Sequence, residues 1–190
     1  MAGKPMKRSR KASLVMMGTV PFLLAACENS ERALVYRTVS ECQRDQVLTT
    51  EECETRFTRA GYESERVAPR YRSESDCEAD FGPQQCQSSG RYFIPLMRGV
   101  LVKDPRPAPD EEEESGAGGG GGSGSNYRSV AQPLYESRDD KGMLRTPDND
   151  KVSRLSGPVE VKESYLHAKP TARVVSRGGF GRAAAARAGG

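Results

Sequence analysis

Four cysteines, Cys42, Cys53, Cys77 and Cys86, constrain the fold of this chain more than any other feature of its sequence. They form two similar units, because VSEC ends at Cys42 and is followed by Cys53, whereas ESDC ends at Cys77 and is followed by Cys86. An even number of cysteines in an exported chain is typical of disulfides, and four cysteines allow three pairings. We favour Cys42–Cys53 and Cys77–Cys86. Closing each short loop would stabilise the fold by roughly 3 kcal/mol.

Zinc binding and thiol catalysis are the alternatives for these cysteines. Structural zinc sites usually contain cysteine pairs separated by two to four residues, and this spacing does not occur here. A catalytic thiol would need a histidine, and the single histidine, His167, lies in a stretch that resembles disordered chain. We therefore expect no metal, no cofactor and no catalytic residue.

The N-terminal segment has the pattern of a lipoprotein signal peptide over residues 1–26. A basic head is followed by an apolar run, Ala12–Ala26, which would reach only about 22 Å as a helix and is too short to span a bilayer. It ends in LAAC, so we expect cleavage between Ala26 and Cys27 and acyl chains on Cys27. The alternatives are an ordinary secreted protein and a cytoplasmic protein with a buried N-terminal helix. The residue after the anchor is Glu28, which favours the outer membrane, facing the periplasm, if the source is Gram-negative.

Charge gives no support for a nucleic-acid partner. The formal net charge is +3, but the first 26 residues hold five basic residues and no acidic one. The remaining chain has 24 basic and 26 acidic residues, a formal charge of −2. A nearly neutral mature protein is not expected to bind a polyanion through bulk charge.

The hydrophobic pattern predicts a small, disulfide-stapled α+β module over residues 27–103. Only 35% of the chain is hydrophobic, and it contains no Trp, so a large core is not expected. Residues 33–36 suit a short strand, Ser40 suits the cap of a brief helical turn, and 92–97 suit an edge strand or an exposed contact. Thr49 and Glu52 have the spacing of a capping box and predict a helix over 51–66; a second helix begins near 73–75 and ends at Gly82-Pro83. In all we expect short helices with one or two short strands, and a largely irregular or disordered remainder.

The composition changes after residue 103. Residues 104–126 are Pro-rich, then acidic, then Gly/Ser-rich, and predict a solvated linker. Residues 127–190 contain turn-like Asp139–Gly142 and Thr146–Asn149, but their apolar residues are too sparse for an independent core, so we expect partial order at best. The last stretch is basic and is a possible binding tail for anionic lipid or wall polymer, with RNA disfavoured and a merely soluble tail as the alternative. Its candidate residues are Arg173, Arg177, Gly178, Gly179, Phe180 and Gly181.

Six short motifs in a fixed order carry a family resemblance. They are LAAC-E, LVYRTVSEC, APRYRSESDCEADFGPQQCQ, FIPLM, AQPLY and VVSRGGFG. In these motifs the chain resembles the YgiB family of uncharacterised bacterial envelope lipoproteins. The resemblance implies an envelope lipoprotein without an established activity. Family members often carry a Met- and Gly-rich stretch after FIPLM, where this chain has an acidic and polyglycine segment, and often lie beside genes for ATP-grasp ligases.

These observations favour a membrane-tethered envelope lipoprotein that is not an enzyme and that binds an envelope protein or polymer. Two alternatives remain. One is an envelope thiol-redox protein, which the absence of Cys-x-x-Cys argues against. The other, suggested by the resemblance, is an accessory of a peptide- or amine-modifying ligase pathway.

Overall fold

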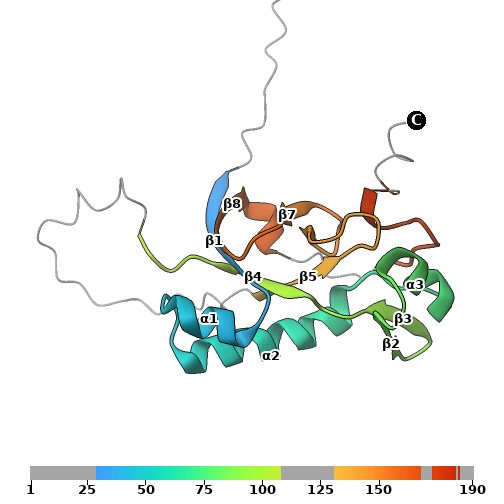
Figure 1. Ribbon diagram of the computed structural model, residues 1–190, viewed down its shortest axis with the longest axis horizontal. Coiled ribbons are helices and arrows are strands. Elements are labelled where there is room, and N and C mark those ends of the chain that lie inside the picture. Colours follow the sequence, from blue (N-terminus) through green and yellow to red (C-terminus); the bar gives the residue numbers. More distant parts are fainter. Residues whose placement is uncertain (1–28, 108–130, 168–172, 183, 185–190) are drawn as a thin grey trace, which may run out of the picture.

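The computed structural model describes residues 29–107, 131–167, 173–182 and 184. Within them, a six-stranded antiparallel sheet is strongly curled and has apolar clusters on both faces, with helices along one of them (Figure 1). The strand order is β7-β6-β5-β4-β1-β8. The bounds are β1 Ser30–Tyr36, β4 Gly99–Lys103, β5 Ala131–Glu136, β6 Leu144–Arg145, β7 Lys151–Ser153 and β8 Gly157–Lys162.

Strands β1 and β4, which are neighbours in the sheet, have buried residues on both faces. Leu34 of β1 and Val102 of β4 pack with the helices, whereas Val35 and Leu101 pack on the other face. Successive side chains of a strand point to opposite faces, so an unbroken apolar run is what a strand covered on both sides requires. The 3₁₀ helix η1 (Glu163–Leu166) contributes Leu166 to the second face.

Two helices cover the first face of the sheet. Helix α1 (Val39–Asp45) begins at Thr38, rather than at Ser40 as expected, because the Thr38 side chain accepts the backbone N–H of Glu41. Helix α2 (Thr50–Val67) has the capping box of Thr49 and Glu52 that the sequence predicts, with both reciprocal hydrogen bonds formed. A disulfide between Cys42 and Cys53 joins the two helices beneath the sheet.

A smaller unit lies at one end of the sheet. Helix α3 (Glu74–Phe81), capped by Ser73, is followed by the hairpin of β2 (Cys86–Ser89) and β3 (Tyr92–Pro95). The second disulfide, Cys77–Cys86, fixes α3 to β2. Both disulfides have the favoured pairing. The expected edge strand near 92–97 is therefore β3, paired with β2 and buried at Ile94.

The expectation of one or two strands and a largely irregular remainder is wrong. Residues 131–167 form β5 to β8 and η1, and β5 is buried along almost its whole length. Their apolar residues are too few for a separate core, but each strand only completes the core that β1 and β4 begin. The module over 27–103 is thus not a separate unit. Residues 104–107, expected to be linker, are also ordered, with Asp104 buried; residues 1–28, with Cys27, and most of the linker lie outside the described residues.

The registers of the strands define two ends of the sheet. We call the end where β1 begins the proximal end; it holds Ser30, Lys103, Ala131 and Lys162. The opposite, distal end holds Tyr36, Gly99, Glu136 and Gly157. Helix α3 lies beyond the distal end of β5 (Figure 1). The proximal and distal ends of the sheet therefore present different residues at the surface.

Candidate functional site

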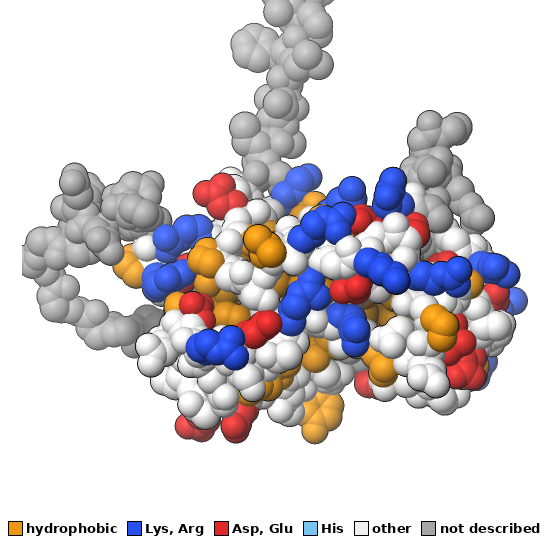
Figure 2. Space-filling model, viewed as in Figure 1, with side chains coloured by type: hydrophobic (Ala, Val, Ile, Leu, Met, Phe, Trp, Pro, Cys, Tyr) orange, Lys and Arg blue, Asp and Glu red, His pale blue; other side chains and the backbone are white. Residues whose placement is uncertain are grey.

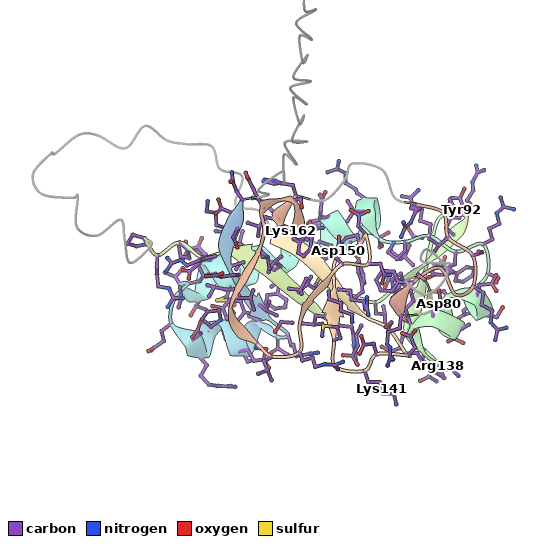
Figure 3. The ribbon with its side chains drawn as sticks, turned by 90° about the horizontal axis from the view of Figure 1, so that it is seen from above. Asp80, Tyr92, Arg138, Lys141, Asp150 and Lys162 are labelled. Atoms are coloured by element: carbon purple, nitrogen blue, oxygen red, sulfur yellow. A yellow bond between two sulfur atoms is a disulfide. The ribbon has the colours of Figure 1, made fainter. Side chains whose placement is uncertain are left out.

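A cleft at the distal end of the sheet contains the best candidate for a binding site. It consists of two hollows that share Arg138, which follows β5. The larger hollow, of about 520 Å³, is lined by Phe81, Gly82, Pro83, Glu136, Ser137, Arg138 and Lys141. The smaller, of about 210 Å³, is lined by Ala79, Asp80, Arg138, Asp139 and Phe180. Figure 3 shows Arg138 and Lys141 at one edge of the molecule, near Asp80 and away from Lys162.

The buried carboxylate of Asp80 joins three segments beneath this cleft. Oδ1 accepts the backbone N–H of Gly178 at 2.7 Å, and Oδ2 accepts the N–H of Phe180 at 3.2 Å and the hydroxyl of Tyr71 at 2.8 Å. The backbone carbonyl of Asp80 accepts the N–H of Arg138 at 2.7 Å. Burial, and then the negative charge of Asp80, raises the pKa of Tyr71, so this phenol remains a donor. Asp80 thereby fixes α3, the C-terminal segment and the Arg138 turn to one another.

An aromatic cluster forms the floor of the cleft. The ring of Phe180 lies 4.8 Å from that of Phe81 and meets the ring of Tyr135 edge-on at 6.4 Å. Only 1% of Phe180 is exposed. The hydroxyl of Tyr135 lies 2.8 Å from that of Ser64 on α2, so the buried phenol has a hydrogen-bond partner. The cleft is therefore backed by packed side chains of both the helices and the sheet.

Asn149 holds the end of the C-terminal segment. Its side-chain N–H donates to the carbonyl of Gly181 at 3.0 Å, and its side-chain oxygen accepts the N–H of Gly181 at 2.8 Å. Gly181 has φ +78°, and a Cβ there would lie 2.8 Å from Cβ of Ser137 and closer still to Asp139. Only glycine meets both conditions at this position.

A buried ion-pair network fixes the turn that carries Arg138 and Lys141. Arg145, which is 2% exposed, donates to Asp140 at 2.8 Å and to the backbone carbonyl of Asn149 at 3.0 Å. Arg154 also donates to Asp140. Burial acts to raise the pKa of Asp140, but hydrogen bonds from Arg154 and Arg145, with their positive charges, outweigh burial and lower it. The turn is therefore fixed by the ion pairs of Asp140 with Arg145 and Arg154.

The rim of the cleft combines positive charge with apolar surface. Arg138 and Lys141 are exposed, and Glu136 is paired with Arg37 at 3.3 Å. Phe81 and Pro83 supply apolar contact beside these cations. The hydroxyl of Ser137 donates to Asp139 at 2.7 Å, and the lining contains neither histidine nor cysteine. This arrangement suits binding of an anionic group attached to an apolar body.

The predicted binding tail is only partly a surface. Gly178, Phe180 and Gly181 are buried, because Asp80 and Asn149 bind their backbone and the aromatic cluster covers Phe180. They are therefore part of the interior, whereas Arg173 and Arg177 are exposed. Arg173 and Val175 also pair through their backbones with Arg70, which attaches this segment beside α2.

The sequence did not reveal the cleft itself. Of the two rim cations, Lys141 lies in the predicted turn Asp139–Gly142 and Arg138 directly precedes this turn. The predicted turn at Thr146–Asn149 supplies Asn149, which forms a hydrogen bond with Gly181. Asp80 lies in the APRYRSESDCEADFGPQQCQ motif, but an aspartate near the end of a helix gives no sign of partners a hundred residues away. The sequence feature that could have indicated a buried segment was the pair of glycines, Gly178 and Gly181, on either side of Phe180.

None of the helices among the described residues is long and apolar enough to cross a membrane. In the same part of the chain, groups of three or more His, Cys, Asp or Glu residues arranged to hold a metal ion are absent.

Comparison with known proteins places the chain in a family. Residues 30–190 match the family described as "Protein of unknown function (DUF1190)". The UPF0441 protein of Erwinia tasmaniensis is 31% identical over 192 residues, which cover 86% of this chain and 77% of the relative. The UPF0441 protein of Serratia proteamaculans is 28% identical over 200 residues, which cover 93% and 83% respectively. No solved structure matches the chain. The protein therefore belongs to the DUF1190 family.

Proposed function

We propose that this protein is a bacterial envelope lipoprotein, anchored by acyl chains on Cys27, whose folded head binds an envelope component without catalysing a reaction. The observation that carries the proposal is the pair of disulfides, Cys42–Cys53 and Cys77–Cys86. Disulfides persist in oxidising compartments such as the periplasm and are rare in the cytosol. An exported chain that begins with a basic head, a short apolar run and LAAC meets the chemical requirements for lipidation.

The family resemblance supports the same proposal at a finer level. The motifs from LVYRTVSEC to VVSRGGFG resemble those of YgiB-type envelope lipoproteins. Several of these motifs meet in the folded head. SESDC forms the cap and the first half of α3, AQPLY lies in β5, and the backbone of RGGFG donates hydrogen bonds to Asp80. Their role in this chain is to assemble one compact head beside the anchor.

The distal cleft is the proposed binding surface of the head. Arg138 and Lys141 present two cations above an apolar floor, and a buried network holds their turn. A carboxylate or phosphate with an adjoining apolar group fits this combination, because the cations neutralise the charge and Phe81 and Pro83 remove apolar surface from water. Cell-wall peptides with free carboxylates and acidic segments of envelope proteins belong to this chemical class.

Lipidation is tested by intact-mass analysis of the chain purified from membranes. The expected mass is that of residues 27–190 with acyl chains and two disulfides. The Cys27→Ser chain should remain uncleaved at this site and carry no fatty acid. An unprocessed, fatty-acid-free wild-type chain with reduced thiols would overturn the proposal.

Binding at the cleft is tested by photo-crosslinking in the native envelope from a probe placed at Pro83, an exposed residue of the cleft lining. The cross-linked species should weaken when Arg138 or Lys141 is changed to Gln. Arg66→Gln is the matched control, because Arg66 is an exposed arginine on α2 whose pairing with Glu63 involves no part of the cleft. Equal cross-linking in all variants would exclude the cations from binding.

A further inference from the structure

The proximal end of the sheet begins almost directly after the residue that carries the proposed anchor. The carbonyl of Asn29 accepts the N–H of Glu163 at 3.0 Å, so Asn29 already belongs to the folded head. Cys27 precedes it by two residues. Two residues reach at most about 7 Å even when fully extended. The chain therefore has no spacer between Cys27 and the head.

This short connection determines which side of the head meets the bilayer. Acyl chains lie in the hydrocarbon layer, and the cysteine that bears them lies at the headgroups. With about 7 Å available, the start of β1 must lie in or against the headgroup layer. Figure 1 shows the start of β1 at the upper side of the view, whereas α1 and α2 lie along the lower side. The distal cleft lies at the other end of the sheet from this contact.

Among the described residues at the proximal end, charges of both signs are balanced. Of the residues named below, four are basic and four are acidic. Lys103 of β4 pairs with Glu31 of β1 at 2.8 Å. A strongly anionic surface attracts clusters of basic residues, whereas a balanced set suits headgroups that carry both charges. The residues concerned are Arg32, Lys103, Arg106 and Lys162, with Glu31, Asp104, Glu160 and Glu163.

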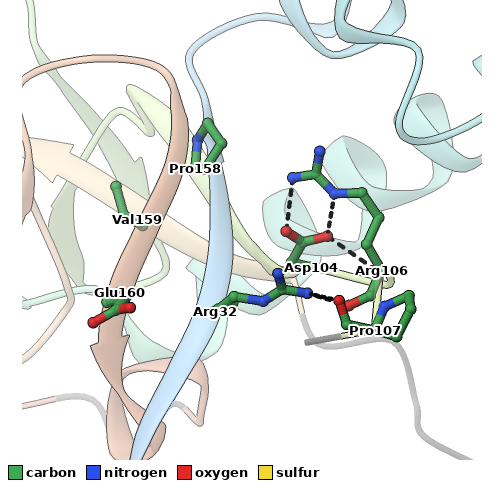
Figure 4. A pocket seen from close by; sticks show the side chains of 7 residues that line it. All are labelled: Arg32, Asp104, Arg106, Pro107, Pro158, Val159 and Glu160. Atoms are coloured by element: carbon green, nitrogen blue, oxygen red, sulfur yellow. Dashed lines mark hydrogen bonds and ion pairs between the residues drawn. The ribbon is translucent and has the colours of Figure 1, made fainter. Parts of the chain in front are cut away.

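A hollow of about 520 Å³ opens at this same end (Figure 4). Arg32 and Glu160 are register partners in the neighbouring strands β1 and β8, and Pro158 and Val159 supply apolar wall. Arg32 donates to the backbone carbonyl of Pro107 at 2.5 Å, and so its guanidinium is fixed at the opening. Among the described residues, Glu160 is exposed and has no ion-pair partner.

The second guanidinium of the hollow is already neutralised. Arg106 binds Asp104 through two hydrogen bonds, of 2.9 and 2.7 Å. The hydrogen bond from Arg106 keeps the pKa of Asp104 below its usual value, so this pair stays ionised and closed. Arg32 and Glu160 remain as a positive and a negative group that both line the hollow. A headgroup with a phosphate and an amine offers the complementary pair of charges.

We infer that the proximal end of the sheet is a membrane-contact surface and that the hollow between Arg32 and Glu160 receives a zwitterionic phospholipid headgroup. The inference rests on the proposed lipid anchor. The phosphate lies against Arg32 and the amine against Glu160, while Pro158 and Val159 contact the glycerol region. The head is then held in one orientation, with the distal cleft directed away from the bilayer.

Lysine reactivity in the full-length lipidated protein tests the orientation. The protein is reconstituted into vesicles of phosphatidylcholine and phosphatidylethanolamine, and a membrane-impermeant acetylating reagent is applied before peptide mass analysis. Lys162 and Lys103 at the proximal end should lose most of their reactivity relative to the unlipidated Cys27→Ser chain, exported behind an ordinary signal peptide. Lys141, beside the distal cleft, should react equally in both and is the internal control.

The possible results separate the two proposals. Failure of the wild-type chain to cosediment with vesicles would overturn the lipid anchor. Cosedimentation with fully reactive Lys162 and Lys103 would leave the anchor intact and overturn the membrane-contact surface.

Glu160→Gln and Arg32→Gln test the hollow itself. The vesicles for this test contain a phosphatidylethanolamine with a photoreactive headgroup; each variant should reduce cross-linking of this lipid to the protein, and Arg138→Gln should not. Glu160 is exposed, so its variant keeps the fold even if Arg32→Gln disturbs the contact with Pro107. Undiminished cross-linking of the lipid to the Glu160→Gln protein would exclude the hollow from headgroup binding.

Discussion

The carboxylate of Asp80 accepts a hydrogen bond of 3.2 Å from the backbone amide of Phe180, a residue 100 positions later in the chain. Both residues are buried, and the same carboxylate also binds the amide of Gly178 and the hydroxyl of Tyr71. One side chain thus completes the hydrogen bonding of a segment that enters the interior without belonging to a strand. Such buried amides would otherwise lack acceptors.

Replacing Asp80 should therefore destabilise the whole head. Asp80→Ala leaves three buried donors without an acceptor, and we expect the free energy of unfolding to fall by about 3 kcal/mol. Asp80→Asn should cost less, because one side-chain oxygen can still accept. The measurement is urea unfolding with the disulfides intact. Glu54→Ala, at an exposed position of α2, is the control and should change stability little.

Two glycines should respond in opposite directions to the same substitution. Gly181→Ala introduces a Cβ against Ser137 at a φ of +78°, and should destabilise the protein by roughly 1–3 kcal/mol. Gly61→Ala lies within α2, where a Cβ meets nothing within 4 Å, and should stabilise by about 0.5–1 kcal/mol. Thermal unfolding of the two variants beside the wild type measures both effects. Equal stability of the Gly181→Ala and wild-type proteins would show that Gly181 does not lie against Ser137 in this conformation.

Acid should weaken the turn that carries the cleft cations. The pKa of Asp140 is lowered in the folded protein by Arg154 and Arg145, against the opposing effect of burial. A lowered folded pKa contributes stability above the unfolded value, near 3.9, and this contribution disappears as the pH falls through the folded pKa. The free energy of unfolding, measured from pH 6 down to pH 3, should decline below about pH 4. Asp140→Asn should be less stable at pH 6 and should decline less over this range; parallel curves would contradict the assignment.

The disulfides should act as structural links that resist exchange. Cys42, Cys53 and Cys77 are fully buried, so a glutathione thiolate has little access to their sulfurs. We expect native protein incubated with a near-neutral glutathione buffer to keep both pairs, as read by non-reducing peptide mass mapping. Removing one pair as Cys42→Ala with Cys53→Ala should lower stability by roughly 3 kcal/mol. Rapid mixed-disulfide formation in the folded protein would instead favour a redox role.

In the first hundred residues the sequence allowed two helices and both disulfides to be predicted, but not strands β2 and β4. Thr49 and Glu52 determine where α2 begins, and Ser73 and Gly82 bound α3, because these signals act within one helical turn. The repeated units around the cysteines led to the observed pairing, since each closes a short loop. The membrane anchor remains a prediction from LAAC.

Tertiary structure alone decided the rest, because the deciding contacts join residues far apart in the chain. Sparse apolar residues such as Leu134 and Val161 read as disorder by themselves, yet they complete an interior begun by β1 and β4. Phe180, which read as part of an exposed basic tail, is covered by rings from α3 and β5. Helix ends depend on capping hydrogen bonds, and the two closed loops on disulfides, between residues that are close in the sequence. Burial depends on which distant segments pack against one another in the folded chain.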